Sequence, residues 1–253
     1  LNTYTGPTTV TGGSLSVSTL ADGGVASNIG QSTNAASNLV LSGGATFSYT
    51  GTGSTDRLFT VGTGGATIGV TGSLVFTNTG SIVNNATAAN TLTLQTGNST
   101  SVGTFNTVWA DPAGFTAALQ KQYPGTWELG GANTYSGGTT ILATSTYSNT
   151  LKLTSPYVVS SGAIVSSPIG KGNLTIGGMG VLDLNGYSLG SSNLTTNPTV
   201  TMTYASLAPA TLKNGTATSV SVYSPIVLTG FASSGPYNYF NQLTGGTLNV
   251  LSV

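Results

Sequence analysis

The sequence lacks the two residue types that most often carry protein chemistry: its 253 residues include no cysteine and no histidine. Without histidine, the commonest general base and metal ligand is missing. Without cysteine, there is no thiol nucleophile, disulfide or thiolate metal site. Serine is abundant, but a Ser-His-Asp triad is excluded. We therefore predict no enzyme activity, and no catalytic, cofactor-binding or metal-binding residues.

Charge is nearly as scarce. The chain has five Lys and Arg and five Asp and Glu, which make up 4% of its residues and give a net charge of zero. Globular proteins usually contain about 25% charged residues. The few basic residues are scattered, which disfavours a nucleic-acid partner, since that surface needs clustered Lys or Arg. A neutral surface of Ser, Thr, Asn and Gly favours association, as in a secreted structural protein.

Long hydrophobic runs are absent as well. No apolar stretch approaches the roughly 18 residues of a membrane-spanning helix, so no such segment is predicted. The chain begins with Leu1 and shows no signal peptide. We expect that a targeting segment has been removed or that the sequence is a fragment.

What the chain does contain is internal repeats. Three motifs occur twice in the same order: NTYTGPTTV and NTYSGGTTI (2–10 and 133–141), SNIG and SPIG (27–30 and 167–170), and NLVLSGGATFSYTG and NLTIGGMGVLDLNG (38–51 and 173–186). A shared order at similar separations, 131 to 140 residues, indicates a repeat architecture. We predict one domain made of two divergent long repeats, roughly 1–130 and 131–253.

Within each half, short runs alternate apolar and polar residues and are separated by Gly-Gly, Asn-Gly or Thr-Gly; SLSVSTL, ATFSYT and TLTLQT are examples. This pattern predicts half-buried strands. Their close spacing predicts a coil with several strands per turn, in which each turn pairs with the next. The predicted fold is all-β: a parallel β-helix (β-solenoid) forming a single elongated body.

Aromatic residues in these runs are expected in the core. Phe47, Tyr49, Phe59 and Phe76 alternate with polar residues, which predicts a stack inside the coil. Tyr4 and its counterpart Tyr135 hold the same place in the NTY motif and are expected to pack the same corner.

One segment departs from the strand pattern. Asp111 is a candidate helix N-cap, a proline follows it, and Ala, Leu, Gln and Lys continue up to Pro124-Gly125. This arrangement predicts a short helix near 112–122, at the junction of the two repeats.

The acidic residues are isolated from one another in sequence. Asp56 and Arg57 are the one adjacent pair of opposite charge, and we expect Asp56 to make a turn or cap while Arg57 bonds carbonyls at a bend; a ligand site is the alternative. Asp183 alternates with leucines and should face out of the coil. Carbohydrate-active β-helices use clustered acids, so such an enzyme is a distant third hypothesis.

The phrase around the second NTY motif resembles a known family. The pattern W-x-L-x-G-x-N-T-Y-x-G-x-T-T-[VI] is carried by Trp127, Leu129, Gly131, Asn133, Thr134, Tyr135, Gly137, Thr139, Thr140 and Ile141. It is similar to the autotransporter-associated β-strand repeats of bacterial autotransporter passengers, and residues 21–62 resemble another unit of that family. The resemblance covers most of the chain and is weakest over 190–240. It implies a right-handed parallel β-helix located outside the cell or on the bacterial surface.

The family's C-terminal translocator barrel is absent from this chain, so we expect that it was cleaved away or that export uses another route.

Our first functional hypothesis is a structural subunit that assembles head-to-tail into an extracellular filament. The ends of a solenoid carry unpaired backbone groups, and complementary open ends make filaments. The C-terminal strand would enter the open N-terminal coil of the next subunit by strand exchange. The expected interface is Leu1, Asn2, Thr3, Tyr4, Thr247, Leu248, Val250, Leu251 and Val253.

The alternative is an autotransporter passenger that acts as an adhesin for a host surface or glycan. The GPYNYFNQ segment concentrates aromatics and carries the candidate binding residues Tyr237, Tyr239 and Phe240. An end-capping loop is the purely structural interpretation of the same segment. The expected partners are therefore copies of the chain itself, or a glycan or cell surface.

Overall fold

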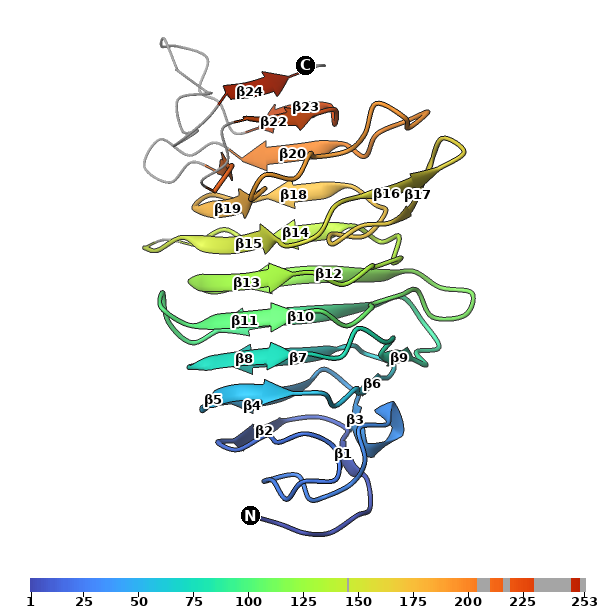
Figure 1. Ribbon diagram of the computed structural model, residues 1–253, viewed down its shortest axis with the longest axis vertical. Helices are drawn as coiled ribbons and strands as arrows, with labels where there is room; N and C mark the ends of the chain where they lie inside the picture. The colour runs from blue at the N-terminus through green and yellow to red at the C-terminus, as the bar shows by residue number, and fades with distance from the viewer. Residues whose placement is uncertain (145, 204–209, 216–218, 230–246, 251–253) are drawn as a thin grey trace.

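The computed structural model describes residues 1–144, 146–203, 210–215, 219–229 and 247–250. Strands of these residues stack on one another along the long axis of the molecule, from the N-terminal end upward (Figure 1). One 3-10 turn, Ala36–Asn38, is the helical segment of the described chain. No helix within these ranges has the length and apolar character needed to cross a membrane. The parallel β-solenoid predicted from the sequence is confirmed.

The described coil has two long sheets, a shorter four-stranded one and the pair β22 (Ser219–Val222) and β24 (Thr247–Val250), all with parallel pairing. The nine-stranded sheet has the order β2 (Ser14–Val17), β4 (Ala45–Tyr49), β7 (Ala66–Val70), β10 (Asn90–Thr96), β12 (Ala117–Gln122), β14 (Thr139–Ile141), β18 (Leu174–Ile176), β20 (Val200–Thr203) and β23 (Ile226–Thr229). The seven-stranded sheet has the order β21 (Thr211–Lys213), β19 (Gly180–Asp183), β15 (Asn149–Leu153), β13 (Gly125–Leu129), β11 (Val102–Phe105), β8 (Ser73–Phe76) and β5 (Thr52–Thr55). The four-stranded sheet contains β1 (Thr8–Val10), β3 (Leu39–Leu41), β6 (Thr60–Val61) and β9 (Val83–Asn84).

Apolar side chains form columns inside the coil, because residues at matching positions of successive turns are paired. In the nine-stranded sheet, Phe47 pairs with Ile68 and Ile68 with Leu94, and all three are fully buried. Burial of one such side chain contributes about 2 kcal/mol.

The predicted aromatic core is confirmed, since Phe47, Tyr49, Phe59 and Phe76 are at most 3% exposed. The rings of Phe59, Phe76 and Phe105 contact one another, with centroid separations of 5.7, 5.9 and 6.3 Å.

The predicted helix near 112–122 is wrong. Residues 117–122 form β12, which pairs in parallel with β10 on one side and β14 on the other. Asp111 does not cap a helix: its Oδ1 accepts hydrogen bonds from the backbone N–H groups of Ala117 (2.7 Å) and Ser136 (3.0 Å), which lie on successive turns. Backbone pairing on both edges outweighs helix propensities, which differ by less than about 1 kcal/mol per residue.

A lateral hairpin leaves the coil between β15 and β18, and the sequence analysis did not anticipate it. Strands β16 (Val158–Ser160) and β17 (Ala163–Ser166) pair antiparallel and extend at the right of Figure 1. Its turn residues Ser161 and Gly162 both have positive φ, 50° and 77°, as a two-residue hairpin turn requires. The Ser-Gly dipeptide between two β-branched runs was the available signal.

Candidate functional site

The two copies of the NTY motif build the same corner, as predicted. Tyr4 and Tyr135 each exchange a hydrogen bond with the threonine four residues later, Thr8 (2.7 Å) or Thr139 (2.6 Å). In each copy, the tyrosine ring lies against a positive-φ glycine of the SNIG or SPIG motif, Gly30 or Gly170.

The serine of each SNIG or SPIG motif completes the corner. Ser27 and Ser167 each donate to the carbonyl of that glycine and accept from the isoleucine N–H between them. The motif therefore builds a hydrogen-bonded structural corner of the coil.

The two corners differ in their burial. Tyr135 is fully buried, whereas Tyr4 is 44% exposed. The second corner is hydrogen-bonded to the preceding turn of the coil. Thr134 N–H donates to the Trp109 carbonyl (3.0 Å), and Trp109 N–H donates to Asn133 Oδ1 (2.7 Å).

The Asp56–Arg57 pair has the structural role expected from the sequence. Arg57 is 2% exposed and donates to the backbone carbonyls of Ala21 and Gly30, among others, and to the hydroxyl of Ser32. Burial lowers the pKa of its guanidinium, while Asp56 and Asp22 act in the opposite direction. Asp56 accepts from the Gly23 N–H and from Asn34. Arg57 thus fixes the first turns and is not free to bind a ligand.

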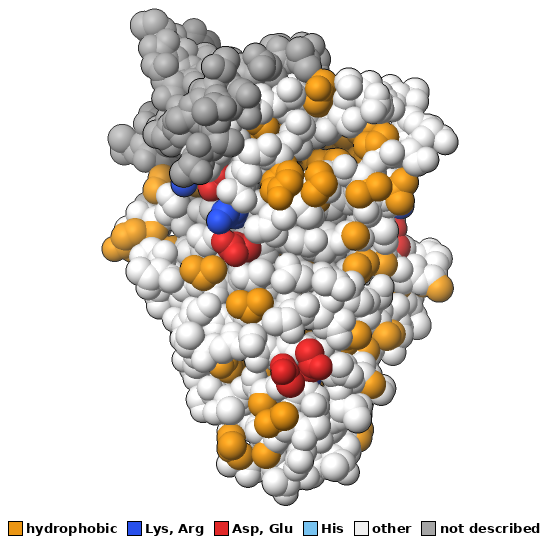
Figure 2. All heavy atoms as spheres, in the orientation of Figure 1, with side chains coloured by type: hydrophobic (Ala, Val, Ile, Leu, Met, Phe, Trp, Pro, Cys, Tyr) orange, Lys and Arg blue, Asp and Glu red, His pale blue; other side chains and the backbone are white. Residues whose placement is uncertain are grey.

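Four of the ten charged residues form a ladder across four turns, which the sequence analysis missed. Glu128 pairs in register with Lys152, Lys152 with Asp183, and Asp183 with Lys213. Lys152 Nζ lies 2.9 Å from Glu128 Oε1, and Lys213 Nζ lies 3.6 Å from Asp183 Oδ2. Acidic and basic side chains alternate over β13, β15 and β19 in Figure 2.

Asp183 corrects one prediction. It belongs to this outer ladder, as its alternation indicated, but it is not an ordinary exposed position, because it is only 5% exposed. Its Oδ1 also accepts from the Asn185 N–H (3.0 Å).

Removing one ion pair of the charge ladder should lower the free energy of unfolding only slightly. The side chains of Lys152 and Glu128 are 31% and 27% exposed, and ion pairs at such sites contribute about 0–1 kcal/mol. We expect Lys152→Met to lower the free energy of unfolding by less than about 1 kcal/mol, and the loss to shrink further in high salt. Urea titrations at two salt concentrations measure both effects; a loss several times larger would show that the ladder organises the sheet.

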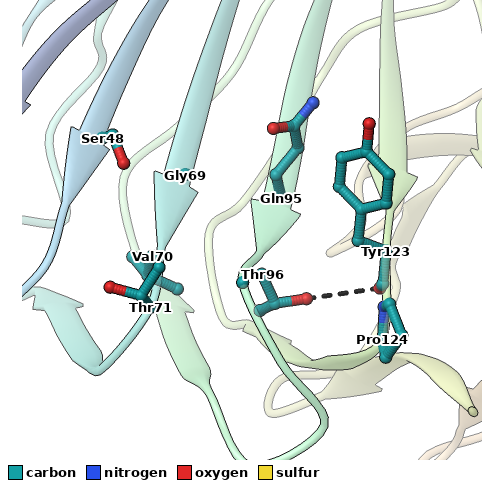
Figure 3. A pocket seen from close by; sticks show the side chains of 9 residues that line it. Ser48, Gly69, Val70, Thr71, Gln95, Thr96, Tyr123 and Pro124 are labelled. Carbon is teal, nitrogen blue, oxygen red and sulfur yellow. Dashed lines mark hydrogen bonds between the residues drawn. The ribbon is translucent and has the colours of Figure 1, made fainter.

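The outer face of the nine-stranded sheet carries a groove of about 390 Å³ (Figure 3). It spans β4, β7, β10 and the turn after β12, and Ser48, Gly69, Gln95 and Tyr123 are among its lining residues. Ser48 pairs in register with Gly69, and Gly69 with Gln95. Gly69 therefore leaves a gap in a row of outward side chains.

The end of β12 supports one side of this groove. Tyr123 is 55% exposed and has φ of 63°, a left-handed conformation that is rare for a bulky residue. Its carbonyl accepts hydrogen bonds from Lys121 Nζ (2.6 Å) and Thr96 Oγ1 (3.3 Å). Lys121 is fully buried, and burial lowers the pKa of its ammonium to about 7. Sequence reasoning missed these residues, because the groove exists only once the turns are in register.

In the described part of the chain, no group of three or more Asp or Glu side chains could hold a metal ion. Glu128 and Asp183 are each engaged with lysines of the ladder. Asp22 accepts from the Asp56 N–H, and Asp111 from two backbone N–H groups.

Among the described residues, those predicted for subunit contact lie at opposite ends of the coil. Leu1 is 77% exposed, Tyr4 is 44% exposed, and Thr3 is exposed too. Asn2 N–H donates to the Ser27 carbonyl (2.9 Å). At the other end, Thr247, Leu248 and Val250 lie in β24 (Thr247–Val250), which pairs in parallel with β22 (Ser219–Val222) of the same chain.

Leu251 and Val253 lie outside the described residues, as do Tyr237, Tyr239 and Phe240. Strand exchange between subunits stays a prediction.

Comparison with known proteins agrees with this architecture. The family model described as "Passenger-associated-transport-repeat" matches residues 1–17 and 119–143, which contain the two NTY corners. The chain is similar to the adhesin BmaC autotransporter of Brucella suis biovar 1 (strain 1330), with 41% identity over 142 residues, or 56% of this chain. The chain spans 3% of the length of that adhesin. No solved structure gives a significant match.

The matched motifs and the parallel coil support each other, because the family model covers the two corners whose hydrogen bonds are the same. The chain thus carries two passenger-associated transport repeats and is similar to an autotransporter passenger, and this similarity indicates an extracellular or cell-surface location.

Proposed function

We propose that this chain is an adhesive segment of a larger surface protein and acts by binding rather than by catalysis. The observation that carries the proposal is its 41% identity over 142 residues to an autotransporter adhesin. A host surface is the partner that this similarity favours.

The geometry supports the proposal. Continuous parallel pairing through nine strands makes a stiff coil, whose outer face offers hydroxyl and amide groups to a partner. Such a face can contact a large surface without the charge complementarity that many interfaces use. Filament formation by strand exchange is a separate prediction, and neither comparison favours it.

Adhesion is directly measurable. Beads coated with the folded chain should attach to cultured mammalian cells in larger numbers than beads coated with serum albumin. Free chain added in excess should displace them, because it competes for the same cell-surface sites. Attachment equal to that of albumin-coated beads on every cell type tried would overturn the proposal.

A further inference from the structure

The groove on the nine-stranded sheet has features of a built binding site. Outward residues of five successive strands form one row: Ser16, Ser48, Gly69, Gln95 and Gln122. Gly69 interrupts this row of side chains. A Cβ at Gly69 would lie 3.7 Å from Ser48 Oγ, an ordinary contact, so neither the backbone nor crowding demands glycine there.

The ring of Tyr123 is placed at the groove at a conformational cost. Glycine adopts positive φ freely, whereas a bulky residue is strained there, and Tyr123 also precedes a proline. Two buried side chains, Lys121 and Thr96, hold its carbonyl. Strain that the surrounding structure maintains is typical of functional positions.

The amide row beside the ring is ordered. Gln95 Nε2 donates to Gln122 Oε1 (2.8 Å), and Gln122 donates in turn to Gln120. In Figure 3, the Gln95 amide and the Tyr123 ring extend in the same direction from neighbouring strands, while Gly69 leaves the space beside Ser48 open. The groove thus offers a hydroxyl, an amide and an aromatic ring on a fixed sheet.

We infer that this groove binds a neutral saccharide chain, an inference that rests on the proposed adhesive function. An exposed ring offers an apolar face for the C–H side of a sugar, and amide and hydroxyl groups match its hydroxyls. No charged side chain is among the lining residues, so the lining has no partner for a phosphate, sulfate or carboxylate. Three strand spacings of about 4.8 Å separate the row positions of Ser48 and Gln122, which gives room for several linked sugar rings.

A peptide strand fits this groove less well. Peptides that add to a sheet need an edge with free backbone groups. Strands β4, β7, β10 and β12 each have a paired neighbour on both sides.

The test uses the whole chain on an array of neutral oligosaccharides that also carries sialylated and sulfated ones. We expect binding to neutral members, with the dissociation constant of the strongest one then measured by titration. Gly69→Thr fills the gap with a β-compatible side chain and should weaken that binding at least about tenfold, a loss of about 1.4 kcal/mol. Tyr123→Gly should weaken it similarly while thermal stability stays equal or rises, since glycine relieves the strain at φ of 63°.

Tyr147→Gly is the matched control, because Tyr147 is 57% exposed and lies outside the groove; its binding should stay unchanged. Three outcomes overturn the inference: no neutral saccharide binds, only acidic ones bind, or the control loses binding as much as the groove variants. If the coated beads still attach to cells in those cases, the adhesive function stands and only the groove assignment fails. If the beads do not attach either, the proposed function fails as well.

Discussion

Replacing Asn133 by alanine should lower the free energy of unfolding by about 3 kcal/mol, whereas Asn2→Ala should cost less than about 1 kcal/mol. Both asparagines open an NTY motif, and each donates through Nδ2 to the carbonyl at the same place in the following motif, Asn28 (2.8 Å) or Pro168 (2.6 Å). Only Asn133 also accepts from the Trp109 N–H of the preceding turn (2.7 Å).

Burial makes the difference between the two positions. Asn133 is 1% exposed, so alanine there leaves a buried N–H and a buried carbonyl without those bonds, and each costs about 1–3 kcal/mol. Asn2 is exposed, and water can replace its side chain. The pair thus compares one motif in two environments within one molecule.

Equilibrium urea unfolding measures both changes, provided that the dependence on urea concentration stays the same. Hydrogen exchange adds a local readout: the Trp109 amide should exchange faster in Asn133→Ala and at the wild-type rate in Asn2→Ala. Equal losses for the two variants would show that the hydrogen bond to the previous turn contributes nothing, and that the motif is stabilised within its own corner.

The sequence predicted the corners and the core because both depend on local patterns. The alternation of apolar and polar residues predicted that Phe47, Tyr49 and Phe76 are buried. The repeated NTY motif predicted that Tyr4 and Tyr135 lie in equivalent corners.

Register between turns could not be predicted, because turn length varies: Leu119 pairs with Thr139, 20 residues on, whereas Thr139 pairs with Leu174, 35 residues on. Both the charge ladder and the groove depend on that register.

The wrong helix prediction over 112–122 also reflects pairing between turns, which the local sequence does not show. The Ala, Leu, Gln and Lys composition favours a helix locally. As a strand, however, it alternates with period two, and Lys121 falls on an inward position. A strand assignment would place Lys121 in the core. Because buried lysine is rare, the sequence alone argues against that assignment. The structure resolves the conflict with three acceptors for its ammonium, the Thr96 hydroxyl (2.9 Å) and the carbonyls of Gln122 (3.0 Å) and Tyr123 (2.6 Å).

Lys121 makes the stability of the fold depend on pH. Burial lowers the pKa of its ammonium to about 7 in the folded chain, against about 10.4 in the unfolded chain. Between these values, the unfolded chain binds a proton at this site that the folded chain does not bind. The free energy of unfolding therefore rises with pH, by as much as about 1.4 kcal/mol per unit. We expect an increase of about 3 kcal/mol from about pH 7.5 to about pH 10.

Tyrosines with a raised pKa affect only the upper edge of this pH window. Burial raises the pKa of Tyr49, Tyr135 and Tyr157, so their ionisation in the unfolded chain opposes the rise only as the pH approaches about 10. Above that value, the unfolded chain releases their protons while the folded chain retains them, so stability falls. The profile should therefore rise to a maximum near about pH 10 and then decline.

Lys121→Leu tests the assignment, because the neighbours of Lys121 in the same column are Leu94 and Ile141. The variant should fold and lose the rise between about pH 7.5 and about pH 10, since an apolar side chain has no proton to release. Lys171→Leu, which changes an exposed lysine, should keep the rise. Urea titrations across this range measure all three proteins.

A wild-type profile that is flat over this range would mean that the three acceptors offset the desolvation of the ammonium and keep it charged in the fold. In that case, Lys121→Leu should shift the whole profile by a constant amount and leave its slope unchanged. The pH dependence of the free energy of unfolding and the shift of the profile in Lys121→Leu thus distinguish two cases. In one, the lysine is neutral in the folded chain; in the other, it donates to the Tyr123 carbonyl as a cation.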